Sequence, residues 1–274
     1  MKRNVKFDSD GVFDIEDHFF MLDKKNKEAN FILEFKSPSE IFDNNCFKDS
    51  EYFLYSISVE EISKDFLMQF NGLNVTIPYK NVVGQFLDEI RIPKINGVEF
   101  NAVNCISNED GKLIGYNTDV YGIEKTLNQF IKSDKKVLIC GNGGASEALQ
   151  YYFTSNNIKY IVVSRSGYTP ISGFGFNITY DALFECDSEF FKNINIVVNA
   201  TPVGTINYPG KVNIPYEKFE NIDIAFDLVY NPSETEFLKT FKELRKQIIN
   251  GYTMLQNQAL KSYKIWKLLK NKSI

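Results

Sequence analysis

The sequence has few of the residues that most often carry metal or nucleophilic chemistry. It contains a single histidine, His18, which lies in a stretch without a recognisable motif. Proton transfer would therefore fall to Lys, Asp, Glu or Tyr. The four cysteines are far apart and form no Cys-x-x-Cys pair. This spacing favours buried, reduced thiols over a zinc site or a disulfide framework, so we expect no bound metal.

Long apolar runs and an excess of positive charge are also lacking. No window approaches about eighteen consecutive apolar residues, so the sequence predicts no transmembrane helix. The polar, acidic stretch at residues 4–14 argues against a signal peptide, and we expect a cytoplasmic protein. The net charge of −4 and the pI near 5.3 argue against a nucleic-acid partner, because binding to the phosphate backbone needs a basic surface.

What the sequence does contain is an ordinary globular composition, with 43% hydrophobic and 24% charged residues. A chain of 274 residues is long enough for two domains, each with its own core. In the second half, strand-like and helix-like segments alternate, which predicts an α/β fold with a parallel sheet covered by helices. The strand-like segments are 136–140, 159–163, 194–198 and 222–227.

The apolar segment 136–140 runs directly into Gly141-Asn142-Gly143-Gly144-Ala145 and then into helix-forming residues. This order predicts a buried strand, a tight turn and a helix start. Backbone amides at a helix start attract anions, and glycines let a diphosphate approach them closely. We therefore predict a dinucleotide site, with Ser146 in place of the usual third glycine. The alternative is a turn with a purely structural role.

The second strand of this unit indicates which dinucleotide is bound. Enzymes that select NAD usually carry an acidic residue about twenty positions after the glycine turn. Here that position reads Val163-Ser164-Arg165-Ser166, without Asp or Glu. An arginine with two hydroxyls suits a 2′-phosphate and favours NADP. The alternative is a solvated surface arginine.

The first half carries weaker signals. Lys80 follows the predicted strand 73–77, which Pro78 ends, and in open α/β sheets ligands bind beyond strand ends of this kind. The other predictions are a hairpin at Asp10-Gly11, a strand at 31–35, a turn at 37–40 leading into a helix, a helix at 83–90, a strand at 100–106, a hairpin at 109–116, a helix at 120–131 and a C-terminal amphipathic helix at 254–269.

Several short motifs occur in the order found in shikimate dehydrogenases, and the chain resembles that family from about Ser37 to its C-terminus. The motifs are Gly72-Leu73-Asn74-Val75-Thr76-Ile77-Pro78-Tyr79-Lys80, Ala102-Val103-Asn104, Gly115-Tyr116-Asn117-Thr118-Asp119, Gly141-Asn142-Gly143-Gly144-Ala145, Asn199-Ala200-Thr201-Pro202-Val203-Gly204, Asp227-Leu228-Val229-Tyr230-Asn231-Pro232 and Met254-Leu255-Gln256-Asn257-Gln258-Ala259.

The resemblance implies a two-domain α/β fold. An N-terminal α/β substrate domain would comprise residues 1–118 plus 251–274, with the C-terminal helix returning to it. A Rossmann-type, doubly wound NADP-binding domain would comprise residues 119–250. The implied activity is reversible hydride transfer between NADPH and 3-dehydroshikimate, which yields shikimate in the biosynthesis of chorismate and aromatic amino acids. The implied partner is thus a small ring carboxylic acid, and the implied assembly is a monomer or a homodimer.

The resemblance also implies roles for individual residues. Lys80 and Asp119 match the catalytic pair. The positions that match substrate-binding residues are Ser37, Ser39, Thr76, Asn104, Tyr230 and Gln258. Those that match cofactor-binding residues are Gly141, Asn142, Gly143, Gly144, Ala145, Ser164, Arg165, Ser166, Asn199, Ala200, Thr201 and Gly251.

Two departures from the family pattern leave alternatives open. Pro38 lies between Ser37 and Ser39, whereas the family's proline follows the second serine, and another register puts Phe35 at the first serine position. The substrate could then be quinate or another hydroxylated ring acid. The first thirty residues have no counterpart in the pattern, which leaves open a non-catalytic NADP-binding paralogue.

Overall fold

The computed structural model describes residues 2–3, 31–34, 53–76, 79–95, 100–131, 134–167 and 169–270. The predicted hairpin at Asp10-Gly11 and the predicted turn and helix after Ser37 lie outside these residues. In the described part of the chain, no helix combines the length and the apolar character needed to cross a membrane.

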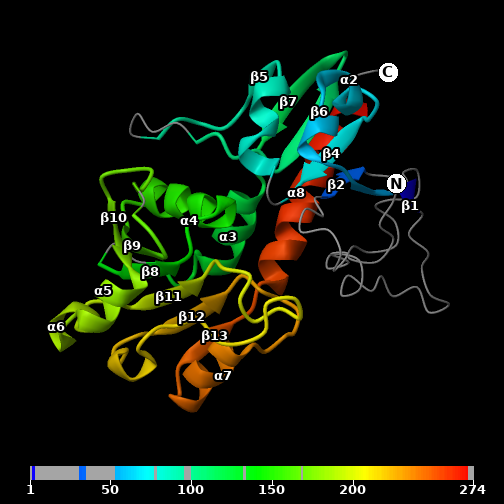
Figure 1. The fold of residues 1–274 in the computed structure, drawn as a ribbon. Helices are drawn as coiled ribbons and strands as arrows, with labels where there is room; N and C mark the ends of the chain where they lie inside the picture. The colour runs from blue at the N-terminus through cyan, green and yellow to red at the C-terminus, as the bar shows by residue number, and fades with distance from the viewer. Residues whose placement is uncertain are drawn as a thin grey trace. The chain divides into compact units, whose positions relative to one another are not determined.

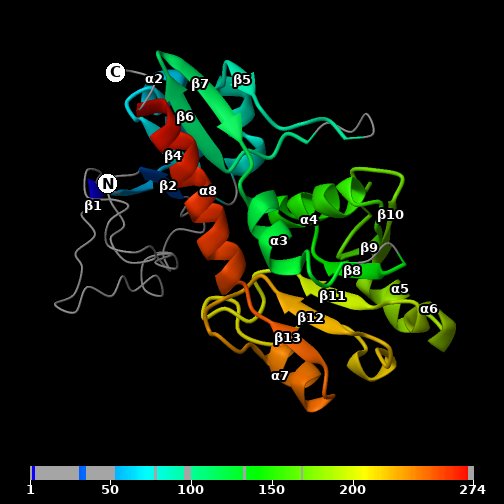
Figure 2. The same ribbon diagram turned by 180° about the vertical axis from the view of Figure 1, so that it is seen from behind.

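The chain forms two compact units (Figures 1 and 2). Unit 1 comprises Met1–Ile92, Asn101–Thr118 and Gln256–Ile274, and unit 2 comprises Pro93–Phe100 and Asp119–Leu255. The division predicted from the sequence differs at two places. The segment Pro93–Phe100 groups with unit 2, and the chain returns to unit 1 at Gln256 rather than at Gly251.

Unit 1 is built on a seven-stranded sheet in which all recorded strand pairs are antiparallel except β5 with β7. The strand order is β1 (Lys2–Arg3), β3 (Phe53–Ser56), β2 (Phe31–Glu34), β4 (Gly72–Val75), β6 (Cys105–Glu109), β7 (Lys112–Tyr116) and β5 (Glu89–Ile90). The hairpin predicted at 109–116 is confirmed as the β6–β7 turn, where Asp110 and Gly111 adopt positive φ. Such a turn needs residues that tolerate left-handed backbone.

Short helical turns cover the core of unit 1. They are η1 (Val59–Glu61), α2 (Lys64–Leu67), η2 (Tyr79–Asn81) and η3 (Val83–Phe86). Apolar side chains of α2, η2 and η3 pack with those of β4, β6 and β7 in one buried cluster that includes Leu67, Leu73, Tyr79, Val83, Ile106 and Leu113.

Two predictions in unit 1 are wrong. The helix predicted at 83–90 is only η3 followed by β5, because the backbone becomes extended at Leu87 and the Asp88 carboxylate accepts a hydrogen bond from Leu113 N at 2.9 Å. The strand predicted at 100–106 begins only at Cys105. The preceding residues make irregular backbone contacts instead, with Val103 N donating to Lys80 O at 2.8 Å.

The C-terminal helix α8 (Tyr252–Lys270) confirms the prediction at 254–269. Within unit 1 it runs alongside β4 and β6 (Figures 1 and 2). Trp266, the only tryptophan, donates from Nε1 to Ile106 O at 2.8 Å. Its indole ring lies over Gly72 so closely that a Cβ there would come within 2.4–2.6 Å of ring atoms.

Unit 2 contains a six-stranded parallel sheet. The strand order is β10 (Gly175–Thr179), β9 (Lys159–Ser164), β8 (Lys136–Cys140), β11 (Ile196–Asn199), β12 (Ile224–Asp227) and β13 (Gln247–Ile249). The first strand in the chain thus lies in the middle, and the chain winds outward in both directions. This is the doubly wound order of dinucleotide-binding folds.

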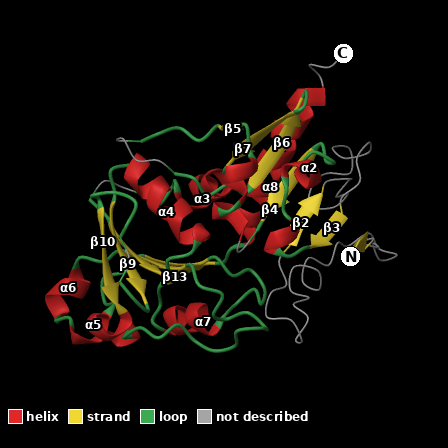
Figure 3. Ribbon diagram, turned by 45° about the horizontal axis from the view of Figure 1, so that its top comes forward, coloured by secondary structure: helices red, strands yellow, loops and turns green. Residues whose placement is uncertain are grey.

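Helices cover both faces of this sheet, as Figure 3 shows. One face carries α3 (Asp119–Leu127) and α4 (Gly144–Ser155), and the other carries α5 (Tyr180–Glu185), α6 (Ser188–Lys192) and α7 (Glu236–Glu243). Residues 137–140 of β8 are buried on both faces, as the absence of alternation predicted. The second face packs on a core that includes Leu138, Cys140, Leu183, Phe191 and Phe237.

The close fit of Trp266 on Gly72 leads to a stability prediction. A Gly72→Ala substitution would force the indole ring away from β4 and weaken its hydrogen bond to Ile106. We expect the unfolding free energy to fall by about 1–3 kcal/mol, as is usual for overpacking. Urea unfolding followed by Trp266 fluorescence measures this change. The control is Gly173→Ala, where a Cβ would meet nothing within 4 Å; equal stability of both variants would contradict the prediction.

Candidate functional site

The glycine turn lies between β8 and α4 in unit 2. Gly141 has φ +104°, and a Cβ there would lie 2.9–3.2 Å from atoms of Ala200 and Thr201. Only glycine satisfies both constraints at this position. At Gly143, the N-cap of α4, a Cβ would meet nothing within 4 Å. The turn therefore brings the backbone close to the next loop on one side and leaves open space at the helix start.

The first turn of α4 has the features of an anion site. No side chain caps the helix at Gly143, and α4 is twelve residues long. Ser146 is fully buried and accepts a hydrogen bond from Gln150 Nε2 at 3.2 Å. It therefore packs inside unit 2 at the place of the usual third glycine. An open helix start of this kind suits a diphosphate, and the cofactor role of this turn stays a prediction.

The segment 164–166 lies at the end of the neighbouring strand. Ser164 is buried, and its Oγ donates to Ser166 O at 2.6 Å and accepts from Asn177 Nδ2 at 2.8 Å. These bonds fix a turn that leaves Arg165 and Ser166 exposed. Because Cys140 pairs with Val163 in the parallel ladder, this turn and the glycine turn leave the sheet at the same edge. The Arg165 guanidinium is available there for a phosphate.

A third loop, 199–201, leaves the sheet at this edge, since Asn199 pairs with Cys140. The Asn199 side chain is fully buried. Its Oδ1 accepts from Thr201 N at 3.0 Å and from Thr201 Oγ1 at 2.6 Å, and its Nδ2 donates to Val203 O at 3.0 Å. We call the loops 141–145, 164–166 and 199–201 the carboxyl edge. Three predicted cofactor segments thus meet in unit 2.

Asp227, the last residue of β12, anchors the loop of the carboxyl edge that begins at Asn199. Its carboxylate is fully buried and accepts from Asn199 Nδ2 at 2.9 Å, Val229 N at 2.9 Å and Thr235 Oγ1 at 2.6 Å. Burial raises the pKa of Asp227 to about 7, and these three hydrogen bonds act in the opposite direction. Asp227 was not among the predicted site residues, although it begins one of the quoted motifs.

Gly251 and Tyr230 lie next to the segment that Asp227 anchors. A Cβ on Gly251 would come within 2.1 Å of Leu228 O, so only glycine fits there. Gly251 N donates to Val229 O at 3.1 Å. Tyr230 follows Val229 and is half-buried. The close approach of these two backbone segments explains the glycine without requiring contact with a cofactor, so its cofactor role stays a prediction.

In unit 1, Thr76 precedes η2 and Lys80 lies within it. Tyr79 N donates to Thr76 O at 2.9 Å, and the buried Tyr79 hydroxyl donates to Ile57 O at 2.9 Å. These contacts fix the turn on which Lys80 lies, and the lysine itself is half-buried. The backbone carbonyl of Lys80 also accepts from Val103 N. The lysine thus projects from an anchored turn just after β4, as its position in the sequence predicted.

Asn104, Thr118 and Gln258, which are far apart in the sequence, meet in unit 1. Asn104 Oδ1 accepts from Thr118 N at 2.6 Å, and Asn104 Nδ2 donates to Thr118 Oγ1 at 3.1 Å. Gln258 Oε1 lies 3.3 Å from Thr118 Oγ1. Asp119 follows directly as the first residue of α3 and is buried. Two of the predicted substrate-binding amides therefore share one threonine hydroxyl.

Other predicted features are not brought together by the described residues. Ser37 and Ser39 lie outside them, so the serine register stays open. The pairing of Lys80 with Asp119 stays a prediction. No group of three or more His, Cys, Asp or Glu side chains suited to a metal ion occurs in the described part of the chain.

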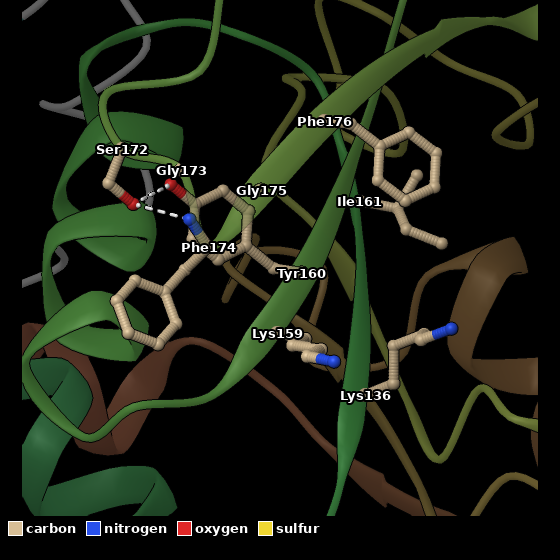
Figure 4. A pocket seen from close by; sticks show the side chains of 9 residues that line it. All are labelled: Lys136, Lys159, Tyr160, Ile161, Ser172, Gly173, Phe174, Gly175 and Phe176. Atoms are coloured by element: carbon tan, nitrogen blue, oxygen red, sulfur yellow. Dashed lines mark hydrogen bonds between the residues drawn. The ribbon is translucent and has the colours of Figure 1, made fainter.

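A cavity of about 710 Å³ lies at the amino ends of β8, β9 and β10, opposite the carboxyl edge (Figure 4). Its lining includes Lys136, Lys159 and Phe176. Figure 4 shows Ser172 and Phe174 on the far side of the strands from Phe176 and Ile161. None of the predicted site residues lines this cavity. In doubly wound folds ligands bind at the carboxyl ends of the strands, so the cavity is not the dinucleotide site.

Comparison with known proteins places the chain in a family, although no family model matches it. An NADP(+) shikimate dehydrogenase from Clostridium beijerinckii is 35% identical over 240 residues, covering 82% of this chain and 85% of the relative. The chain belongs to the shikimate dehydrogenase family. A crystal structure of shikimate dehydrogenase 1 from Peptoclostridium difficile matches with a TM-score of 0.65 and 34% identity over 78% of each chain.

A second family structure, a shikimate dehydrogenase in complex with NADP+, matches with a TM-score of 0.62 and 31% identity. The match covers 76% of this chain and 78% of the chain in that structure. These matches confirm the resemblance identified from the motifs and the two-domain α/β fold of the family. The chain is accordingly an NADP-dependent oxidoreductase of this family.

The raised pKa of Asp227 predicts a pH dependence of stability. Between pH 3.8 and about pH 7 the native state binds more protons than the unfolded state, so the unfolding free energy should fall as pH rises through this window. The loss attributable to Asp227 is on the order of 4 kcal/mol at most.

Urea unfolding at several pH values tests this expectation in the wild type and in Asp227→Asn. The asparagine keeps an oxygen for Asn199 and Val229 and can donate to the Thr235 hydroxyl, but it does not titrate. The difference in stability between the two proteins should therefore shift in favour of the variant from pH 4.5 to pH 7.5. Parallel pH profiles would contradict the assignment.

Proposed function

We propose that this protein catalyses the reversible, NADP-dependent interconversion of 3-dehydroshikimate and shikimate, with Lys80 and Asp119 as the catalytic pair. The observation that supports this most is the carboxyl edge of unit 2, where three loops of a family member converge around an open helix start. Gly141 permits that convergence because no Cβ fits there. The substrate is inferred from the relatives, which are named shikimate dehydrogenases.

The residues of the carboxyl edge fit NADP. The amides of the glycine turn and of the first turn of α4 would hold the diphosphate. The exposed Arg165 with its two serines would hold the 2′-phosphate, since a guanidinium forms paired hydrogen bonds with phosphate oxygens. Loop 199–201 and Gly251 complete the proposed cofactor set. When bound, the cofactor supplies or accepts the hydride.

On the substrate side, the Lys80 ammonium would donate a proton to the oxygen of the ring ketone during reduction and take it back during oxidation. The Asp119 carboxylate would hold the ammonium in its charged form. Thr76, Asn104, Gln258 and Tyr230 would bind the ring hydroxyls, and Ser37 and Ser39 would bind the ring carboxylate.

We further propose that residues 1–118 with 251–274 act as the substrate domain and residues 119–250 as the cofactor domain. The sheet of unit 1 carries Lys80, Thr76 and Asn104 on or beside its strands, which supports this assignment. We propose a cytoplasmic enzyme that works as a monomer or homodimer on a free small molecule, without a nucleic-acid or membrane partner.

An assay with purified protein tests this function. We expect NADP+ to be reduced with shikimate. NAD+ should be a poorer cofactor because the proposed site favours the 2′-phosphate, and quinate should be a poorer substrate because the relatives are named for shikimate. Absorbance at the nicotinamide band follows all four combinations of ring acid and cofactor. Preference for quinate would make the chain a quinate dehydrogenase. Tight NADPH binding without turnover of either acid would identify a non-catalytic paralogue.

Replacing the proposed proton donor tests the mechanism. We expect Lys80→Ala to lower kcat about 10²- to 10⁴-fold, because general acid–base groups contribute that much. NADP+ affinity should stay unchanged, since Lys80 lies in unit 1. The matched control is Lys159→Ala, which removes an exposed lysine from the amino end of β9. Full turnover in a folded Lys80→Ala protein would overturn the assignment.

A further inference from the structure

A buried polar network lies in unit 1 among the proposed substrate-binding residues. Its members are Asn74, Asn104, Thr118 and Ser262, and none is more than 9% exposed. They come from β4, from the residue before β6, from the residue before α3 and from α8. Buried polar groups need partners, and a network of this kind fixes the direction of each side chain.

The orientation of the Asn104 amide follows from its contacts with Thr118. Thr118 N can only donate, so the side-chain atom 2.6 Å from it must be the carbonyl oxygen of Asn104. The Asn104 NH2 group then lies 3.1 Å from Thr118 Oγ1 and donates to it. Thr118 therefore holds both ends of this amide, and the second proton of the NH2 group has a fixed direction.

The hydroxyl protons of Thr118 and Ser262 extend this series of hydrogen bonds. Thr118 Oγ1 has one proton, and the nearest acceptor for it is Ser262 Oγ at 3.0 Å, whereas Gln258 Oε1 and Asn104 Oδ1 both lie at 3.3 Å. Ser262 Oγ in turn donates to Asn74 Oδ1 at 2.9 Å. These hydrogen bonds run in one direction, from Asn104 through Thr118 and Ser262 to Asn74. Each hydroxyl accepts one bond and donates the next, so none is left without an acceptor.

The same contacts place Gln258. Ser262 lies one helical turn after Gln258 on α8, so the two side chains share a face of the helix. By bonding to Asn74 in β4, Ser262 fixes that face against the sheet. This places the Gln258 side chain beside the network, with its Oε1 3.3 Å from Thr118 Oγ1. Asn74 also lies two residues before Thr76, the first proposed ring-binding residue.

We propose that Thr118 and Ser262 are positioning residues: Thr118 orients the Asn104 amide and Ser262 holds the part of α8 that carries Gln258, so that both amides meet the hydroxyls of the ring acid. This inference rests on the proposed function. Neither residue needs to touch the substrate. Thr118 holds both ends of the Asn104 amide, and Ser262 holds the helix that carries Gln258.

A matched pair of variants at Thr118 tests the proposal. Thr118→Val keeps the shape but removes the hydroxyl, whereas Thr118→Ser keeps the hydroxyl and removes only a methyl group. We expect Val to raise the KM for shikimate about tenfold, the effect of one lost orienting hydrogen bond, with the KM for NADP+ unchanged. Serine should restore the KM to within about twofold of the wild type.

Ser262→Ala provides an independent arm. We expect a rise in the KM for shikimate of about five- to tenfold, with little change in kcat. The control is Ser155→Ala, which removes a hydroxyl that donates to Tyr151 O of its own helix in unit 2. The emission of Trp266, one turn beyond Ser262, reports whether α8 still packs on unit 1.

Binding of shikimate and of quinate is also measured by titrating Trp266 fluorescence, so that turnover is not required. Weaker ring-acid binding in the Val and Ala variants, with wild-type Trp266 emission, would support the positioning role. A fall in Tm with unchanged KM and affinity would show a structural role only and overturn it. Binding without turnover in the wild type would refute the proposed activity alone. No ring-acid binding in the wild type would overturn both.

Discussion

The carboxyl edge of unit 2 depends on the close approach of backbone segments at places where no side chain fits. At Gly141 a Cβ would collide with the loop after β11, and at Gly251 it would collide with the carbonyl of Leu228. Because the glycines allow these contacts, β8, β11 and β12 can end close together and their loops can share one edge. The open start of α4 and the turn that carries Arg165, just after β9, then leave the sheet at the same edge. The proposed dinucleotide site thus rests on backbone packing, and the proposed choice of NADP rests on the Arg165 side chain.

Two buried networks, one in each unit, follow the same physical rule. In unit 2 the Thr235 hydroxyl and the Asn199 amide satisfy the Asp227 carboxylate. In unit 1 the Thr118 hydroxyl joins Asn104 to α8. A polar group that is withdrawn from water without a partner destabilises the fold by about 1–3 kcal/mol. Both networks avoid this penalty, and both leave the adjoining loops with a defined conformation.

Much of unit 2 could be predicted from the sequence because its signals are local. An apolar strand buried on both faces, a glycine turn and a helix start follow one another within residues 136–150, and the alternation that follows predicts the parallel sheet. Asp227 belongs to a recognisable motif, but its burial depends on Thr235 and Asn199, which no periodicity reveals.

Unit 1 was less predictable because its structure depends on contacts between residues far apart in the sequence. Residues 83–90 have helix-like composition, yet the Asp88 carboxylate bonds to the β7 backbone and stops the helix after one turn. Residues 100–104 are apolar enough for a strand but pair irregularly. The contact between Thr118 and Ser262 joins positions 144 residues apart. Only the folded chain brings them together, and Ser262 could have been suspected solely from its place one turn after Gln258.

The deep burial of β8 has a consequence for the thiol at its end. Cys140 lies directly before the glycine turn and has no exposed surface, and burial raises the pKa of its thiol above the ordinary value of 9.0. Since only the thiolate attacks electrophiles and oxidants, this sulfur stays inert while the sheet is intact. A cysteine beside the proposed cofactor edge therefore does not make that edge sensitive to oxidation, and alkylation of Cys140 would report that the central strand has opened.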